Sequence, residues 1–386
     1  MEPVAITGIG AVTPIGNNAI DFAQSLKAGK VGVNGSAFRI KNYTPPRYAR
    51  TLDPHIQYIL SAAEEAVRDS ALDFEALDRS RIGVAVSSSK GGMRTLDQWF
   101  ERSRKKPSAL SGVRAYANFV PHIAGQWVAR HWNTSGPIKA AIAACATGLY
   151  ALMEGVRMIE EGDADICIAG AGDSSMTELM LSGYRNMGVL SSGGIRPFDL
   201  ERDGFMVGEG AGIVILEKLS HARSRRARIY GTVLAHQYGF EASHPISFSV
   251  DGTGLRRCLT ELLRRSDLSP VDIDYLNLHG TATQQGDLYE TRQIKAAFGK
   301  AAHRIPMSAT KSLVGHMLGA SGAVEVIACL IALRDGFVPP TANLETPDPE
   351  CDLDYTPRAS KPKRINIACS LSMGFGGQLG AILVAR

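Results

Sequence analysis

One cysteine and two histidines stand in contexts that suit nucleophilic catalysis. Cys145 follows a run of small and apolar residues, 140–144, and precedes a helical pattern that starts near Leu149. This spacing predicts a strand-to-helix corner, where backbone N–H groups and the helix dipole favour the thiolate. His279 and His316 each adjoin a glycine near the end of a predicted strand, where ligands gather in open α/β sheets. Each residue alone would more often be a packing residue, but the three together indicate one site.

The elements around these residues alternate between strands and helices, which predicts a largely buried sheet covered by helices. Apolar runs rich in β-branched residues predict strands over 4–9, 82–86, 138–144, 166–169, 213–216, 229–235, 273–278, 305–307, 365–370 and 381–384. Helical periodicity predicts helices over 20–28, 56–70, 149–159 and 322–334. We expect one compact unit of two halves: residues 1–235 carry Cys145, and residues 236–386 carry both histidines.

Composition excludes several classes of protein. The 386 residues are 45% hydrophobic and 21% charged, as in globular α/β enzymes and unlike disordered or collagen-like chains. The net charge of +4 gives no support to nucleic-acid binding. The longest apolar run, 326–333, is too short to span a bilayer, and residues 1–4 do not resemble a signal peptide. Six cysteines without C-x-x-C spacing predict no metal site and a reducing, cytoplasmic location.

Nucleotide-binding and serine-hydrolase functions lack their motifs. Gly8-Ile9-Gly10 follows a predicted strand, but Thr13 stands where the dinucleotide fingerprint needs its third glycine. The sequence contains neither a G-x-S-x-G elbow nor a phosphate loop that ends in Gly-Lys-Ser/Thr.

The residues around the candidate nucleophile and histidines resemble the motifs of β-ketoacyl-[acyl-carrier-protein] synthases of the elongating, Cys-His-His type. The matching segments lie in order over nearly the whole chain: 7–10, 144–148, 196–199, 203–212, 279–283, 311–316, 339–344 and 374–377. The resemblance implies a thiolase-like α/β fold, with two similar halves in five αβαβα layers, and usually a homodimer.

The implied reaction is a decarboxylating Claisen condensation in fatty acid, polyketide or related specialised lipid biosynthesis. Cys145 would hold the acyl group as a thioester, which divides one difficult condensation into two steps. His279 and His316 would stabilise the enolate formed when malonyl-acyl carrier protein loses its carboxylate. By resemblance, the N–H groups of Cys145 and Phe375 form the oxyanion hole, and Phe375 is a mobile gate. No cofactor is expected, because the phosphopantetheine arrives on the acyl carrier protein.

The resemblance assigns supporting roles to further residues. Lys311 and Glu325 resemble a pair that biases the protonation and orientation of His316. By resemblance, Thr281 and Thr283 contact the pantetheine arm. By alignment with the family, Leu96 lies near the acyl chain. Cys167 and Cys329 lie in apolar runs and are interpreted as packing residues.

Three features depart from the family pattern. Gln378 and Leu379 stand where the family has Thr-Asn, and Ile246, next to Ser247, stands where it has a pantetheine-binding threonine. The chain is also shorter than typical members in the stretches 30–57 and 190–195. These departures leave open an alternative function as a non-catalytic or partner-dependent subunit of a heterodimeric ketosynthase. The presence of Cys145 argues against a subunit without a nucleophile.

Two other members of the fold superfamily fit less well. A thiolase would carry a second cysteine in the late segment, which here reads Ser372-Met373-Gly374-Phe375. A starter-type synthase would carry asparagine in place of one of the two histidines.

Basic residues form two clusters that could attract an acidic carrier protein. The first cluster is Arg102, Arg104, Lys105 and Lys106, and the second is Arg223, Arg225, Arg226 and Arg228. Either cluster is equally compatible with an ordinary solvated surface.

Overall fold

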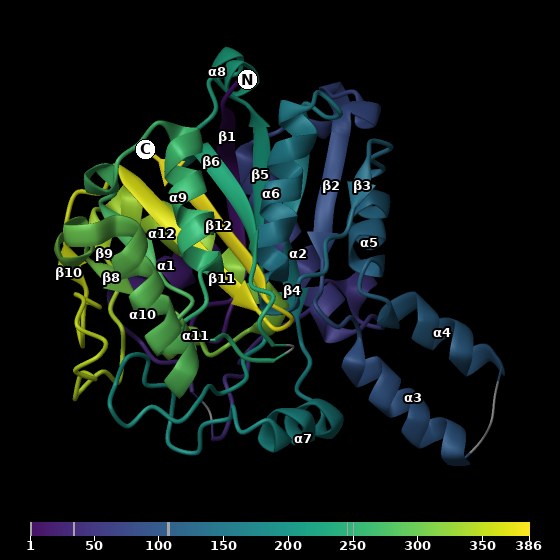
Figure 1. Cartoon of the computed structure of the whole chain (residues 1–386). Coiled ribbons are helices and arrows are strands. Elements are labelled where there is room, and N and C mark those ends of the chain that lie inside the picture. Colours follow the sequence, from purple (N-terminus) through teal and green to yellow (C-terminus); the bar gives the residue numbers. More distant parts are fainter. Residues whose placement is uncertain (1, 34, 106–108, 245, 250) are drawn as a thin grey trace.

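A ten-stranded sheet runs through the whole molecule (Figure 1). A computed structural model describes residues 2–33, 35–105, 109–244, 246–249 and 251–386. The strand order is β3-β2-β4-β5-β1-β6-β12-β11-β7-β8. The strands of the first half are β1 (Val4–Val12), β2 (Ile82–Ser87), β3 (Ile138–Lys139), β4 (Ile166–Asp173) and β5 (Gly210–Lys218). Those of the second half are β6 (Gly231–Phe240), β7 (Tyr275–Asn277), β8 (Met307–Ser308), β11 (Ile367–Gly374) and β12 (Gln378–Ala385).

The two halves of this sheet repeat one topology. Numbered within each half, both sets of five strands follow the spatial order 3-2-4-5-1. Their first strands, β1 and β6, pair antiparallel where the halves meet, with Val4–Ile6 opposite residues 231–233. This repetition shows two similar halves, which sequence similarity alone could not. The division at 235/236 stays a prediction, and β6 spans both sides of it.

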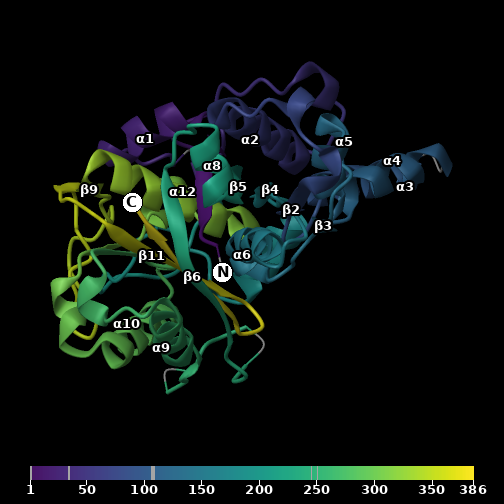
Figure 2. The ribbon, with the colours of Figure 1, turned by 90° about the horizontal axis from the view of Figure 1, so that it is seen from above.

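Helices cover both faces of each half-sheet and give five layers (Figure 2). The outer layers are α2 (Pro54–Ser70) with α5 (Ile123–Trp132), and α9 (Gly254–Ser266) with α10 (Gln284–Phe298). The middle layer consists of α6 (Thr147–Glu160) and α12 (Ser321–Asp335), which pack on each other. Residues 321–333 of α12 are all buried, because other layers surround this helix. The structure thus has the two similar halves in five αβαβα layers that the resemblance implies.

The remaining elements lie outside these layers. They are α1 (Ala19–Lys27), α3 (Met93–Lys105), α4 (Ala109–Phe119), α7 (Glu178–Asn186), α8 (Leu219–Ser224), α11 (Lys311–Val314) and the small sheet of β9 (Phe337–Val338) and β10 (Lys361–Pro362). Helices α3 and α4 project away from the body (Figure 1). In the part of the chain that the structure describes, no helix is long and apolar enough to cross a bilayer.

Most predicted strands are confirmed with shifted ends, but the strand expected over 138–144 is wrong. It ends at Lys139, and residues 140–143 leave the sheet. The backbone of Ala143 is engaged locally instead, because its N–H donates to Thr147 Oγ1 at 3.0 Å and its carbonyl accepts from Ala146. Backbone N–H and carbonyl groups that form hydrogen bonds within a tight turn are not available to pair with a neighbouring strand.

The Gly8-Ile9-Gly10 pattern has a packing role. A Cβ on Gly8 would lie 2.2 Å from the carbonyl oxygen of Ala66, and one on Gly10 would lie 1.9 Å from that of Ala62. Both carbonyls belong to α2, so the glycines let this helix lie directly against β1. This agrees with the exclusion of a dinucleotide fingerprint.

We predict that Gly10→Ala destabilises the fold by more than about 3 kcal/mol, because its methyl group would overlap helix backbone that cannot rotate away. Urea unfolding would measure the change. Gly183→Ala is the matched control: a Cβ there meets nothing within 4 Å, and alanine favours the helix α7. Equal stability of the two variants would contradict this account of the pattern.

Candidate active site

Cys145 lies in a strained turn that directly precedes α6. Ala144, the residue before it, has a left-handed φ of 48°, which non-glycine residues rarely adopt. The hydroxyl of Thr147 closes the turn by donating to the Ala144 carbonyl at 2.7 Å. On the other side lies Gly374, where a Cβ would come within 2.4 Å of the Ala143 oxygen. The turn therefore places the thiol at the start of a helix and beside the β11–β12 connection.

Glycines bring the starts of the two central helices together. A Cβ on Gly148 would lie 2.7 Å from the Ala323 nitrogen and from the Gly319 oxygen. A Cβ on Gly322 would lie 2.7 Å from the Leu149 nitrogen. This contact between backbones places Cys145, which precedes α6, next to the loop that carries His316 and leads into α12.

Hydrogen bonds from the backbone around His279 fix the position of this residue. Its backbone N–H and that of Gly280 donate to the two carboxylate oxygens of Glu290, at 2.6 and 2.8 Å. Asp287, one turn earlier on α10, accepts from the N–H groups of Ala282 and Phe198 at 3.0 and 2.8 Å. Burial is the largest cause that raises the pKa of Glu290 to about 8 and that of Asp287 to about 7. These two buried carboxyl groups fasten the histidine loop to α10.

His316 approaches His279 at a right angle. The ring centroids are 5.7 Å apart with an interplanar angle of 89°. Nδ1 of His316 lies 3.1 Å from the Ser321 hydroxyl, and the edge of its ring packs on Phe205. When Ser321 donates to Nδ1, the ring hydrogen of His316 is on Nε2, so Nε2 is a donor.

Both imidazoles are neutral at physiological pH. Burial is the first cause that lowers the pKa of His279 and His316 well below the ordinary value, and the positive charge of Lys311 adds to it. Lys311 is fully buried and forms an ion pair with Glu325. Burial raises the pKa of Glu325, and Lys311 opposes that effect. The structure thus places Lys311 where its charge acts on both histidines.

Most of the predicted site residues line one cavity of about 490 Å³. Those that the structure brings together there are Cys145, His279, Thr281, Thr283, His316 and Phe375. The threonine hydroxyls lie 3.2 Å apart. Leu96 is half-buried on α3 and is not among the lining residues. Among the described residues, no group of three or more His, Cys, Asp or Glu side chains could hold a metal ion.

The expectation that the corner favours the Cys145 thiolate needs correction. Cys145 is 4% exposed, and burial raises the pKa of its thiol above the ordinary value. The charges of Lys90 and Lys311 and a hydrogen bond from the Phe375 N–H lower it, but by less than burial raises it. The sequence shows the helix start but not the depth of burial. The resting nucleophile is therefore a thiol.

Some of the residues that depart from the family pattern line the cavity, and others do not. Leu379 is fully buried in the core, and the Gln378 amide oxygen accepts from the Tyr150 hydroxyl at 3.2 Å, so neither residue lines the cavity. Ile246 and Ser247 do line it. His244, to which the sequence analysis assigned no role, lines it as well.

Several residues at the site escape sequence reasoning. Phe205 lines the cavity and stands in segment 203–212, which resembles the family, but the sequence assigned it no role. Glu290 and Asp287 follow His279 by 11 and 8 positions on a helix that was not predicted. The only signal of these two residues is that acidic residues spaced by three share one helix face, which is common on exposed helices.

Comparisons with known proteins agree with this geometry. The model of the β-ketoacyl synthase N-terminal domain matches residues 38–222, and that of the C-terminal domain matches residues 230–345. The chain belongs to the β-ketoacyl synthase family. This synthase is 35% identical to the 3-oxoacyl-[acyl-carrier-protein] synthase 2 of Coxiella burnetii over 410 residues, which cover 99% of this chain and 98% of that protein.

Solved structures of ketosynthases superpose on this synthase over its full length. One is from a type II polyketide acyl carrier protein in complex with its ketosynthase bound to the hexaketide; it has a TM-score of 0.92 and 30% identity, with 100% and 99% of the two chains covered. Another, the ishigamide ketosynthase/chain length factor, has a TM-score of 0.92 and 26% identity with the same coverage. The predicted family and fold are confirmed.

We predict that alkylation of Cys145 by iodoacetamide speeds up by about tenfold per pH unit from pH 7 to 9 without a plateau, because burial raises the thiol pKa. Intact-protein mass would follow the reaction. Cys145→Ala reports the background from the five other cysteines, which are all buried. A plateau already reached below pH 7 would show that the helix start outweighs burial.

Proposed function

We propose that this synthase catalyses the decarboxylating condensation of an acyl group on Cys145 with malonyl-acyl carrier protein to give a 3-oxoacyl-acyl carrier protein. The observation that carries the proposal is that one thiol and two neutral imidazoles line the same cavity. The reaction needs this set: a nucleophile to hold the acyl group and two uncharged donors where an enolate develops.

In the first step the Cys145 sulfur attacks the incoming acyl thioester. A neutral imidazole takes the thiol proton, because burial keeps both histidines able to accept it. The proton then leaves with the departing pantetheine thiol, and the acyl group remains on Cys145. The Phe375 N–H, which donates to the Cys145 sulfur, lies close enough to support the oxyanion of this step.

In the second step the malonyl thioester loses carbon dioxide and its electron pair moves into an enolate. Hydrogen bonds from His279 and His316 stabilise the enolate oxygen without a competing positive charge on either ring. The enolate carbon then attacks the acyl carbonyl, the bond to sulfur breaks, and the Cys145 thiolate that leaves takes a proton from water. The product is longer by two carbons and remains on the carrier.

The cavity provides for a substrate attached to a carrier protein. Thr281 and Thr283 line it together with Ile246 and Ser247. Compared with the family pattern, the pantetheine arm therefore loses one hydroxyl contact at Ile246 and can gain another at Ser247. We propose that the phosphopantetheine belongs to the carrier and that the synthase needs no cofactor of its own. The six cysteines are unpaired thiols, which agrees with a cytoplasmic enzyme of fatty acid or polyketide biosynthesis.

Only the first basic cluster is left as a candidate surface for the carrier. In the second, Arg225 pairs with Glu217 and Arg228 with Asp69. That cluster lies on and just after α8, at the end of the molecule opposite α7 (Figure 1). Residues 187–189, which follow α7, and Phe375 in the β11–β12 turn line the cavity. In the first, Arg102 and Arg104 are exposed on α3; Lys106 and the Lys105 side chain lie outside the described residues.

We predict that His279→Ala lowers malonyl-carrier decarboxylation by at least about 100-fold, because it removes one donor to the enolate oxygen. Cys145→Ala should abolish extension of every acyl carrier, because no acyl group can be held. The mass of the carrier-bound product measures both effects. His303→Ala, an exposed histidine outside the cavity, is the control and should keep the wild-type rates.

A wild-type protein that neither acylates Cys145 nor decarboxylates malonyl-carrier when tested alone would overturn the proposal. The alternative of a subunit that depends on a partner would then account for the departures at Ile246, Gln378 and Leu379.

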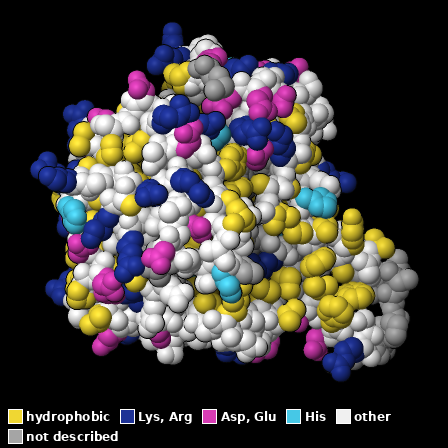
Figure 3. Space-filling view, in the orientation of Figure 1, with side chains coloured by type: hydrophobic (Ala, Val, Ile, Leu, Met, Phe, Trp, Pro, Cys, Tyr) yellow, Lys and Arg dark blue, Asp and Glu magenta, His cyan; other side chains and the backbone are white. Residues whose placement is uncertain are grey.

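We further propose that the synthase is a homodimer that assembles across β3. Among the residues that the structure describes, this strand is an edge of the sheet and pairs with β2 alone. Ile138 on it and Ile142 beyond it are 45% and 56% exposed, and hydrophobic side chains also gather over the region of α3 and α4, where Phe100, Val113 and Tyr116 are exposed (Figure 3). An edge strand can pair with its own copy about a twofold axis, which would cover this apolar face.

We predict that Ile142→Asp converts the dimer to a monomer, because it places a charge in the apolar contact. Sedimentation equilibrium of the pure protein measures the mass. Ile20→Asp is the matched control, since Ile20 is 68% exposed on α1 at the other side of the molecule (Figure 2). A monomeric wild type that dimerises only with a second ketosynthase-like chain would replace the homodimer with the heterodimer, the arrangement named for the ishigamide ketosynthase/chain length factor.

A further inference from the structure

A second cavity, of about 630 Å³, lies on the far side of a chain segment that borders the catalytic cavity. Phe205 lines the catalytic cavity, and Met206, the next residue, lines the second one. Segment 205–208 is extended, since it forms β-bridges with Phe38 and His316, and consecutive side chains of an extended chain point to opposite sides. Among the described residues, none lines both cavities. The second cavity is therefore a separate space.

The floor of the second cavity is apolar. The side chains of Phe38, Ile195 and Met206 line it, are buried, and belong to one hydrophobic cluster. Val31, which also lines the cavity, packs against this cluster. The ring of Phe38 and the thioether of Met206 both form favourable contacts with aromatic groups. The floor thus fits the apolar part of a ligand, and an aromatic ring fits it best.

The rim of the second cavity carries charges of both signs. The Arg196 guanidinium donates to the Gly193 carbonyl at 3.3 Å and lies 4.0 Å from the Glu201 carboxylate. A guanidinium has several further N–H donors, which a ligand can use. Glu201 and Glu345 are exposed on the rim. Asp199 also lines the cavity, but it is buried, and its carboxylate accepts three backbone N–H groups.

A ligand that uses this rim must itself carry both signs of charge. A negative group is needed for Arg196, and a positive group is needed for Glu201 and Glu345. Hydrogen bonds to charged groups are stronger than those between neutral groups, so a ligand with both charges gains at both ends of the rim. A ligand with a carboxylate alone would face two glutamates, and an amine alone would leave the arginine unused.

The floor of the second cavity also supports the loop that carries His316. The Met206 carbonyl accepts the His316 N–H at 2.9 Å. A Cβ on Gly315 would lie 2.5 Å from the Phe38 ring, so this ring lies directly against the loop backbone. A ligand on the floor would therefore contact the two residues that hold the loop.

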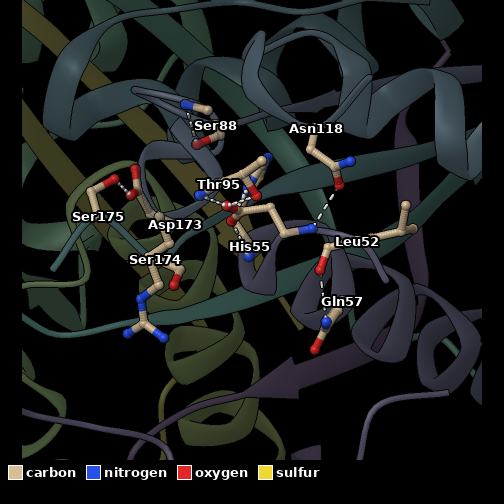
Figure 4. A network of polar contacts seen from close by, with 12 residues as sticks. Leu52, His55, Gln57, Ser88, Thr95, Asn118, Asp173, Ser174 and Ser175 are labelled. Carbon is tan, nitrogen blue, oxygen red and sulfur yellow. Dashed lines mark hydrogen bonds and ion pairs between the residues drawn. The ribbon is translucent and has the colours of Figure 1, made fainter. Parts of the chain in front are cut away.

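On its other side the loop is held by groups that already bond one another. Asp173, at the end of β4, is fully buried and accepts the Gly319 N–H at 3.3 Å (Figure 4). Its carboxylate also accepts the hydroxyls of Ser89 and Ser175. These bonds fix that side of the loop without a ligand, so the side of Phe38 and Met206 is the one on which a ligand acts.

We propose that the second cavity binds an α-amino acid with an aromatic or other large apolar side chain. The carboxylate pairs with Arg196, the ammonium group pairs with Glu201 and Glu345, and the side chain covers Phe38 and Met206. By adding contacts to these two floor residues, the bound ligand restrains the His316 loop. The proposal goes beyond the proposed function and does not depend on it.

The first test compares three compounds with the same ring by isothermal titration calorimetry of the purified chain. They are L-phenylalanine, 3-phenylpropanoate, which lacks the amine, and 2-phenylethylamine, which lacks the carboxylate. We expect phenylalanine to bind about tenfold more tightly than either analogue, the value of one hydrogen bond to a charged group. Equal affinity for the three compounds, or no binding of phenylalanine at millimolar concentration, overturns the proposal and leaves the proposed function intact.

Variants locate the carboxylate. Arg196→Gln should weaken the binding of phenylalanine by about tenfold and should not weaken that of 2-phenylethylamine. Arg185→Gln is the matched control, because Arg185 is also exposed and paired with a glutamate, Glu178, but does not line the cavity. Thermal unfolding checks that both variants fold. Equal weakening in the two variants overturns the assignment.

Two further measurements test the place of the site. Protein alkylated at Cys145 by iodoacetamide should bind phenylalanine with unchanged affinity, because the two cavities are separate. Loss of binding would place the ligand in the catalytic cavity and overturn the proposal. Hydrogen exchange, followed by mass spectrometry, should slow at Gly315 and His316 when phenylalanine is bound. Unchanged exchange there would overturn the link to the loop.

Discussion

The site depends on the contact between the two central helices at Gly148 and Gly322. Because neither residue has a side chain, the backbones at the starts of α6 and α12 meet directly. The nucleophile of one half and the histidine loop of the other then share one cavity. Any larger residue at these positions would separate the helices and pull Cys145 away from His316 without altering either catalytic side chain.

Burial sets the protonation of every reactive group in the site. It keeps His279 and His316 neutral, raises the thiol pKa of Cys145, and raises the pKa values of Glu290 and Asp287 into the physiological range. Lys311 and Glu325 are also buried, and they form an ion pair with each other. Cys145 is therefore protonated at rest, and the proposed mechanism needs an imidazole to take the thiol proton when the sulfur attacks.

Sequence patterns located the parts of the fold that depend on local information. β-Branched runs predicted the strands, and the contexts of Cys145, His279 and His316 predicted three residues that line one cavity, because glycines and hydroxyls mark them within a few positions. The strand over 138–144 failed because local hydrogen bonds of Thr147 and Ala143 compete with pairing. Glu290 and Asp287 acquire their roles from tertiary contacts with the His279 loop and, for Asp287, with the backbone of Phe198, and no local pattern distinguishes them from ordinary helix positions.

The repeated strand order has a consequence for how such a site can arise. Cys145 belongs to the first set of five strands, and both histidines belong to the second. A cavity between the two sets can therefore combine residues of different kinds, because the sets repeat a topology without repeating a sequence. The first set supplies a thiol and the second supplies imidazoles, while the strand order of the two stays the same.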